Sequence, residues 1–100
     1  MEKQKRTYDL EEIKNAFSDV DRLRITRSAY RNAVALGMRR GDIVDVVQSL
    51  KPSDFYKSMT TYADSRIWQD VYHARYGDSV LYVKFMKDYE DYLVVSFKEK

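Results

Sequence analysis

The sequence contains no cysteine, only one histidine (His73), one proline and three glycines among its 100 residues. The absence of cysteine excludes disulfides, zinc-thiolate sites and thiol nucleophiles. A single histidine means that no pair of imidazoles in one chain can divide acid and base duties. Three glycines do not make a phosphate-binding loop, and no histidine and carboxylate cluster stands at a metal-ligand spacing. We therefore expect no metal ion and no cofactor.

Long apolar runs are also missing. No stretch approaches the roughly 18 residues that a membrane helix needs, so we expect no membrane span. The basic N-terminus, residues 1–6, is not followed by the apolar segment of a secretory signal. The lack of cysteine fits a reducing compartment, and together these features predict a cytoplasmic protein. A length of 100 residues predicts one domain, residues 1–100.

The net charge of the chain is small, but its charged residues are unevenly distributed. The formal net charge is +2, which does not by itself indicate a nucleic-acid-binding protein. Residues 1–40 carry ten basic and six acidic side chains, whereas residues 41–100 carry eight and ten. This asymmetry predicts a basic surface on the first part of the chain.

Apolar residues at helical spacing predict three helices in the first half. The first follows the capping residue Asp9 and continues to Val20. The second covers residues 26–36, and the third covers residues 43–50 before Pro52 stops it.

The second half changes to the period of β-strands. Short connections between the strands favour an antiparallel meander, and the fold class is therefore α+β. We expect three N-terminal helices packed on one face of a four-stranded or slightly larger antiparallel twisted sheet. The predicted strands are residues 54–62, 67–73, 80–86 and 92–98.

The last two strands alternate in character, which predicts one face covered by helices and one face in water. The predicted covered residues are Leu81, Val83 and Phe85, then Leu93, Val95 and Phe97, whereas Tyr82, Lys84, Ser96 and Lys98 face the water.

Four segments carry a family resemblance: DFYKSMTTY at 54–62, IWQDVY at 67–72, VVSFKEK at 94–100 and TRSA at 26–29. On these segments the sequence resembles the MqsR family of motility quorum-sensing regulator toxins. The resemblance implies a RelE-like fold and the toxin of a type II toxin–antitoxin system. It also implies a ribosome-independent endoribonuclease that inhibits translation by cutting mRNA at GC-containing triplets such as GCU. The implied partner is an MqsA-like antitoxin with a zinc-binding N-terminal domain and a DNA-binding C-terminal domain, so contact with DNA would be indirect.

The residue types that this family uses for catalysis are present here at Lys57, Gln69, Tyr82 and Lys98. The resemblance implies that these four side chains form the catalytic surface. His73 stands where the family requires no histidine and is not carried over; we interpret it as a surface strand residue.

Cleavage by attack of the ribose 2′-hydroxyl on the adjacent phosphorus needs a base, positive charge and an acid. A lysine with an ordinary pKa of about 10.4 is protonated at neutral pH and serves as phosphate clamp or acid. It serves as a base only if a second lysine or burial lowers its pKa, and Lys57 and Lys98 form such a pair if their strands are neighbours. We assign both lysines to the phosphate, with proton transfer as an alternative role for one of them, Tyr82 to donation or stacking, and Gln69 to positioning.

Exposed aromatic and basic side chains are candidates for binding RNA. Each also has a plainer interpretation: Trp68 as a packing anchor and the arginines as a solvated basic face. The candidate residues are Tyr56, Tyr62 and Trp68 for stacking on bases, and Arg24, Arg27 and Arg31 for phosphates.

Two other functions compete with that of an mRNA endonuclease. One is a non-catalytic module that binds RNA or protein. The other is a regulator that acts mainly through its antitoxin complex on DNA.

Overall fold

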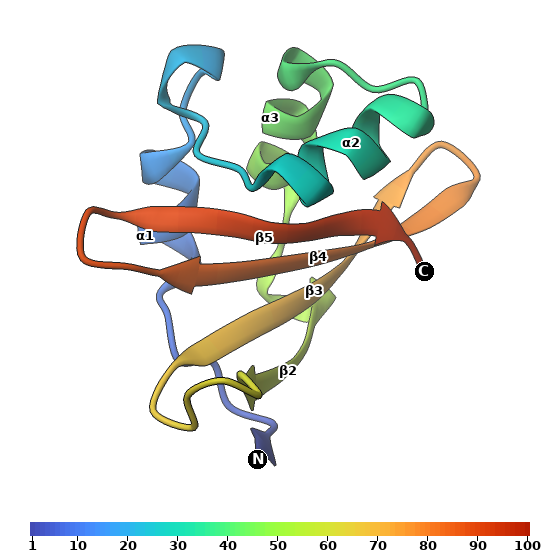
Figure 1. Cartoon of the computed structure of the whole chain (residues 1–100). Coiled ribbons are helices and arrows are strands. Elements are labelled where there is room, and N and C mark those ends of the chain that lie inside the picture. The colour runs from blue at the N-terminus through green and yellow to red at the C-terminus, as the bar shows by residue number, and fades with distance from the viewer.

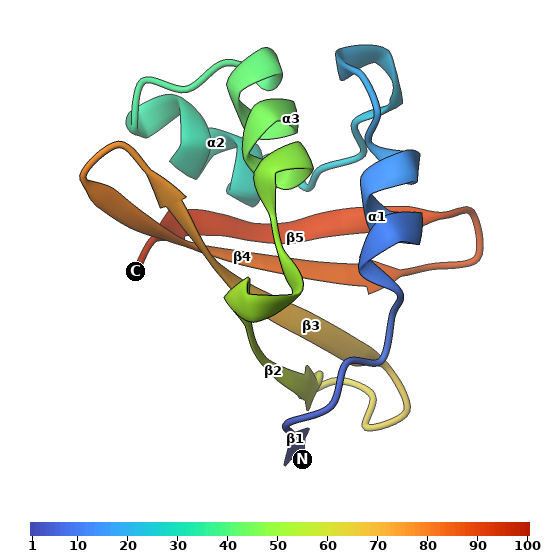
Figure 2. The ribbon, with the colours of Figure 1, turned by 180° about the vertical axis from the view of Figure 1, so that it is seen from behind.

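The computed structural model describes residues 1–100 and places three helices on one face of an antiparallel sheet (Figure 1). Figure 2 shows α3 crossing this face, with α1 and α2 on either side of it. None of the helices is long and apolar enough to cross a membrane. The helices are α1 (Leu10–Ala16), α2 (Arg27–Ala35) and α3 (Arg40–Ser49), with 3₁₀ turns at Val20–Arg22 and Pro52–Asp54.

The sheet has five strands in the order β1-β2-β3-β4-β5, and all neighbours are antiparallel. The predicted α+β class and the meander are confirmed. The additional strand is the N-terminal segment, in which Glu2 pairs with Met59 of β2. The strands are β1 (Glu2–Lys3), β2 (Phe55–Thr60), β3 (Trp68–Tyr76), β4 (Ser79–Lys87) and β5 (Tyr92–Glu99).

The first helix is shorter than predicted. Asp9 caps it as expected, but the helix ends at Ala16, and Val20 lies in a separate 3₁₀ turn. The carboxylate of Asp19 accepts from the backbone amides of Asp21 (2.9 Å) and Arg22 (3.1 Å). An aspartate that binds following amides starts a new turn, and this local bonding competes with continuation of the helix.

The second helix is fixed at its start by the edge of β5. The hydroxyl of Thr26 accepts from the amide of Ala29 (3.2 Å), as a helix cap does. The amide of Thr26 also donates to the carbonyl of Val94 (3.0 Å), and the amide of Val94 donates to the carbonyl of Arg24 (3.0 Å). Gly37, with φ of +80°, follows the helix and allows the chain to turn away.

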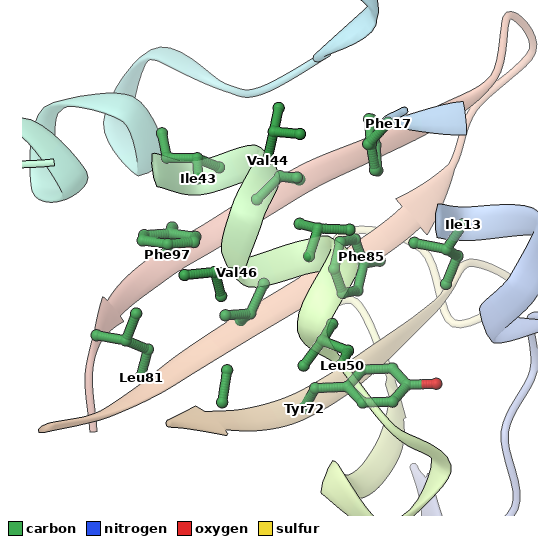
Figure 3. Packing of buried hydrophobic residues seen from close by; sticks show 14 of the residues in the cluster. Ile13, Phe17, Ile43, Val44, Val46, Leu50, Tyr72, Leu81, Phe85 and Phe97 are labelled. Carbon is green, nitrogen blue, oxygen red and sulfur yellow. The ribbon is translucent and has the colours of Figure 1, made fainter. Parts of the chain in front are cut away.

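Aromatic rings join the helices to the sheet in the core (Figure 3). The Phe85 ring lies 6.1 Å from that of Phe17 and 5.8 Å from that of Tyr72, and all three residues are fully buried. The third helix covers them with the apolar stripe that its sequence predicts. Ile43, Val46 and Val47 of that stripe lie in α3, and Leu50 follows directly after the helix, which ends one residue earlier than predicted.

The predicted alternation holds in β4 but not in β5. Phe85 pairs with Val94, whereas Lys84 pairs with Ser96, so Val95 is an extra residue in a β-bulge. The bulge shifts the side-chain alternation within β5. The covered residues of this strand are therefore Tyr92, Val94 and Phe97, and the prediction that Leu93 and Val95 are covered is wrong.

Candidate active site on the open face of the sheet

Side chains from four neighbouring strands meet on the face of β2–β5 that points away from the helices, called here the open face. Directly paired residues of an antiparallel ladder project to the same side. Tyr82 of β4 pairs with Lys98 of β5, and Lys57 of β2 pairs with Val71 of β3. Gln69 of β3 has the same parity as Val71. All four predicted catalytic residues therefore lie on one face.

Tyr82 is at the centre of this group. The Lys98 Nζ atom lies 5.3 Å from the centre of its ring, and its hydroxyl lies 4.0 Å from the Met59 sulfur. Burial raises the pKa of Tyr82, although the nearby Lys57 opposes this effect. The phenol is therefore protonated at neutral pH and is available as a hydrogen-bond donor.

A second bulge brings two successive residues of β2 to the open face. The register shifts between Phe55 and Lys57, so that both Tyr56 and Lys57 face away from the helices. Phe55 packs edge-on against the buried Tyr72 on the other side, at 5.5 Å between ring centres. The Tyr56 ring stacks on His73 at 4.3 Å. Strict alternation would place only one of Tyr56 and Lys57 on the open face.

Lys57 is held by a carboxylate that the sequence analysis did not single out. Its Nζ atom donates to the Glu2 carboxylate at 2.7 Å. This hydrogen bond is the main reason why the pKa of Lys57 is raised and that of Glu2 is lowered. The condition for pairing Lys57 with Lys98 is not met, because β3 and β4 lie between their strands. Lys57 is therefore a fixed ammonium group in the free protein.

Lys84 is a further lysine on this face, two residues along β4 from Tyr82. It is half-buried, and its Nζ atom lies 5.7 Å from the centre of the Tyr82 ring. Burial lowers the pKa of Lys84, and the positive charges of Lys98 and Lys57 lower it further. The alternation of β4 put Lys84 beside Tyr82, but no sequence signal distinguished it from an ordinary exposed lysine.

His73 lies between two tyrosines rather than at the margin of the sheet. Tyr56 stacks on it, and the Tyr82 ring lies 6.1 Å away. Burial lowers the pKa of His73, and the charge of Lys100 acts in the same direction. The imidazole is therefore mostly neutral at physiological pH and extends the aromatic surface.

Methionine sulfurs are the side-chain partners of Gln69 and Tyr82. The Gln69 Nε2 atom lies 4.0 Å from the Met86 sulfur, and its side chain makes no hydrogen bond to a protein oxygen or nitrogen. Thioethers are weak acceptors, so both Gln69 and Tyr82 retain bonding capacity for a ligand.

The other predicted stacking residues lie elsewhere. Trp68 pairs with Thr60 and has the parity of Asp70, which belongs to the covered face. Its ring is covered by the Lys3 ammonium at 4.1 Å, and its carbonyl accepts from the Tyr8 hydroxyl at 2.8 Å. These contacts favour its interpretation as a packing anchor. Tyr62 is fully exposed in the loop between β2 and β3, beside a hollow of about 250 Å³ that the N-terminal residues also line.

The three predicted arginines are not part of the group around Tyr82. Arg24 is bound by Asp88 at 2.8 Å and by Glu90 at 3.3 Å, at the turn between β4 and β5. Arg27 and Arg31 are exposed on α2, and no hydrogen bond or ion pair joins either to the open face. The charge of Arg24 is therefore paired with carboxylates of the same chain, which the sequence alone did not show.

The open face is cationic. Lys57, Lys84 and Lys98 contribute ammonium groups, and Glu2 is the acidic side chain beside them. No group of three histidine, aspartate or glutamate side chains gathers in the structure as metal ligands would. Amines, a phenol and a free amide on one surface are suited to binding and protonating a phosphodiester.

The fold and this surface together identify the protein as a small α+β protein with a candidate anion-binding face on its sheet. Comparison with known proteins then specifies the family. Residues 5–99 match the family described as "Motility quorum-sensing regulator, toxin of MqsA". The chain is also 50% identical over 78 residues to the mRNA interferase toxin MqsR of Escherichia coli (strain K12), a match that covers 78% of this chain and 79% of that protein. The protein belongs to the MqsR toxin family.

Proposed function

We propose that the protein is an endoribonuclease that cleaves mRNA as the toxin of a toxin–antitoxin pair. Its relative in Escherichia coli is named an mRNA interferase toxin, and the family is described as the toxin of MqsA. The observation that supports the proposal most is the gathering of Lys57, Gln69, Tyr82 and Lys98 on one open face.

The proposed reaction is an internal transesterification. The ribose 2′-hydroxyl gives its proton to water, and its oxygen forms a bond to phosphorus while the bond from phosphorus to the 5′-oxygen breaks. The products are a 2′,3′-cyclic phosphate and a 5′-hydroxyl, and the 5′-oxygen takes up a proton. Tyr82 is the proposed donor of that proton, which it regains from water. Burial keeps its phenol protonated, and the hydrogen-bond contact of its hydroxyl is with a sulfur.

The lysines supply positive charge to the phosphate in this proposal. Preorganised charge at the developing phosphorane is commonly the largest catalytic contribution. Lys98 beside the Tyr82 ring is exposed and is therefore available to an RNA chain. Lys57 becomes available when the phosphate replaces the Glu2 carboxylate. Gln69, whose amide is free of strong partners, would bond to the ribose or phosphate oxygens.

The aromatic pair of Tyr56 and His73 suits an unpaired base. Their stacked rings lie on the open face beside Tyr82. Single-stranded RNA is commonly bound by stacking of its splayed bases on aromatic side chains. We therefore propose Tyr56 as a base-binding residue and exclude Trp68 from this role.

The family resemblance supplies the finer parts of the proposal. We infer cleavage at GC-containing triplets without the ribosome and without a metal ion, in the cytoplasm where mRNA is present. We infer an MqsA-like antitoxin as the protein partner, with contact to DNA only through that partner.

Single-turnover cleavage of an RNA oligonucleotide that contains GCU triplets tests the function. The wild-type protein should cut it in EDTA, whereas Lys57→Ala, Tyr82→Phe and Lys98→Ala should each be slower by roughly 10²–10⁴-fold. Lys87→Ala is the matched control, because Lys87 is exposed at the end of β4 and its Nζ atom lies over Tyr92 instead of Tyr82.

Three outcomes test the residue assignment and the competing functions. Equal rates in the wild-type protein and all three variants would end the assignment of these residues. RNA binding without cleavage by the wild-type protein would indicate a binding module. Induction of the chain in cells, with and without the antitoxin, should produce growth arrest that the antitoxin relieves.

A further inference from the structure

We propose that Lys84 is a fifth active-site residue, whose ammonium group binds the phosphate at the cleavage position together with Lys57 and Lys98. This inference rests on the proposed function and adds a residue that neither the family resemblance nor the sequence pattern assigned. It starts from the position of Lys84 in the sheet.

The ladder places Lys84 between the strands that carry the other two lysines. Across β3 and β4 it pairs with Val71, which in turn pairs with Lys57 of β2. Across β4 and β5 it pairs with Ser96, two residues before Lys98. The strand β5 is one spacing of about 4.8 Å from β4, and β2 is two such spacings away, so the lysine side chains of β2 and β4 approach each other by leaning over β3. A single phosphate above β4 is therefore within reach of all three amines.

Lys84 and Lys98 are arranged around the same ring. Their Nζ atoms lie 5.7 Å and 5.3 Å from the centre of Tyr82, the proposed proton donor. Contacts of this length with a tyrosine ring are consistent with cation–π attraction. They keep both ammonium groups close to the hydroxyl that would meet the substrate. A phosphate beside that hydroxyl would be bound from two sides.

The environment of Lys84 does not neutralise its charge. Lys57 has Glu2 as a partner at 2.7 Å, but Lys84 makes no ion pair and no hydrogen bond. It is half-buried, and Val71 beneath the lysines is fully buried although it belongs to the open face. The ionisable groups around Lys84 are Lys57 of β2 with its partner Glu2 of β1, His73 of β3, Tyr82 of β4 and Lys98 of β5. The like charges of Lys84 and Lys98, neither of which has an ion-pair partner, repel each other, and an anionic ligand relieves that repulsion.

The pH dependence should identify Lys84 among the lysines. Burial and the neighbouring ammonium groups lower the pKa of Lys84, whereas Glu2 raises that of Lys57. As the pH increases, Lys84 therefore loses its charge before Lys57 does. If the charge of Lys84 binds phosphate, cleavage should decline on the alkaline side with the titration of Lys84. Arginine remains charged there, so Lys84→Arg should shift this decline to higher pH.

The experiment compares wild type, Lys84→Met, Lys84→Arg and the control Lys87→Met on one RNA oligonucleotide. Single-turnover rates are measured across pH, and affinity is measured across salt with the same oligonucleotide carrying a 2′-deoxy sugar at the cleavage position. We expect Lys84→Met to slow cleavage about 10²–10³-fold, as loss of one preorganised charge does. The dependence of log affinity on log salt should weaken by about 0.7, which corresponds to one lost phosphate contact on a single strand.

The variant Lys84→Arg distinguishes a role of the positive charge from a structural or general-base role. Lys84→Arg should retain most of the neutral-pH rate and the full salt dependence, and the melting temperatures of both variants should not fall. A Lys84→Arg protein as slow as Lys84→Met would overturn the proposal in favour of a neutral amine acting as base. Wild-type rate and salt dependence in Lys84→Met would overturn it as well.

Failure of this inference differs from failure of the proposed function. If the wild-type protein cleaves RNA and Lys84→Met does so equally well, only the role of Lys84 is lost. If no protein cleaves but binding of the 2′-deoxy oligonucleotide depends on Lys84, the phosphate contact stands and the nuclease function falls. If the wild-type protein neither cleaves nor binds, both are wrong.

Discussion

The two faces of the same sheet differ in what they contribute. On the covered side of β4, Leu81, Val83 and Phe85 are at most 1% exposed. On the open side of the same strand, Tyr82 and Lys84 are half-buried and carry groups that bind ligands. Neighbouring residues in the sequence thus belong to different surfaces. Stability and the proposed chemistry should therefore respond separately to substitutions one residue apart.

The largest difference in the free energy of unfolding is expected between the variants Phe85→Ala and Met86→Ala. Phe85 contacts the rings of Phe17 and Tyr72, and its truncation leaves a cavity in the core. We expect the free energy of unfolding to fall by about 3–5 kcal/mol, against about 1 kcal/mol or less for the half-buried Met86. Urea denaturation followed by circular dichroism measures both. Equal losses would contradict the separation of the two faces.

The second comparison is between Asp70→Asn on the covered face of β3 and Gln69→Ala on its open face. The buried Asp70 carboxylate accepts from the amides of Thr7 (3.0 Å) and Tyr8 (2.9 Å), which ties the N-terminal segment to β3. An asparagine loses the charge and can turn an NH₂ group toward these donors. We expect a loss of about 1–3 kcal/mol in unfolding free energy. Gln69→Ala should leave thermal stability nearly unchanged and slow cleavage, so a reversed pattern would refute the assignment of these two residues.

A third test concerns the turn between β4 and β5, which belongs to neither face. The Arg24 guanidinium, by its hydrogen bond, holds the pKa of Asp88 well below its usual range. A carboxyl whose pKa is lower in the folded state contributes stability above its unfolded pKa of about 3.9. That contribution is lost as the pH falls toward the folded value. In Arg24→Ala the loss of stability between neutral pH and pH 3 should be smaller than in wild type, as measured by thermal unfolding across pH. An identical acid profile would show that the ion pair has no energetic role.

The smallest change in stability is expected for Tyr72→Phe. The Tyr72 hydroxyl is buried without a hydrogen-bond partner, and burial raises its pKa to about 12, so it is neutral at any moderate pH. Removing an unsatisfied polar group should leave the unfolding free energy unchanged or increase it by up to about 1 kcal/mol. The same substitution at Tyr82, on the open face, should slow cleavage while leaving the melting temperature in place. Marked destabilisation by Tyr72→Phe would reveal a partner for its hydroxyl.

Local sequence patterns predicted the elements and most of the faces because those depend on residues close in the chain. The alternation of β4 and the apolar stripe of α3 were visible in this way. The bulges were not, because an extra residue such as Val95 changes the pairing without changing composition. Leu93 was therefore assigned to the wrong side.

The candidate site was predicted through the family resemblance rather than through the chemistry of isolated residues. Without the family resemblance, Lys98 would be interpreted as an ordinary solvated lysine. Two features depended on contacts between distant parts of the chain. Glu2 reaches Lys57 only because β1 pairs with β2, and Arg24 is neutralised by a turn that lies 64 residues further along the chain. Pair contacts at that separation leave no periodic signal.

The bond between Glu2 and Lys57 has a consequence for the ligands that the open face is proposed to bind. A carboxylate that belongs to the same chain competes at an effective concentration that dissolved anions do not match. A free phosphate ion that displaces this carboxylate gains only its own contacts with the three amines. An RNA chain gains in addition the contacts of its neighbouring phosphates and bases with the same face. If the open face binds RNA as proposed, the tethered acid should therefore favour chains of nucleotides over free phosphates and single nucleotides.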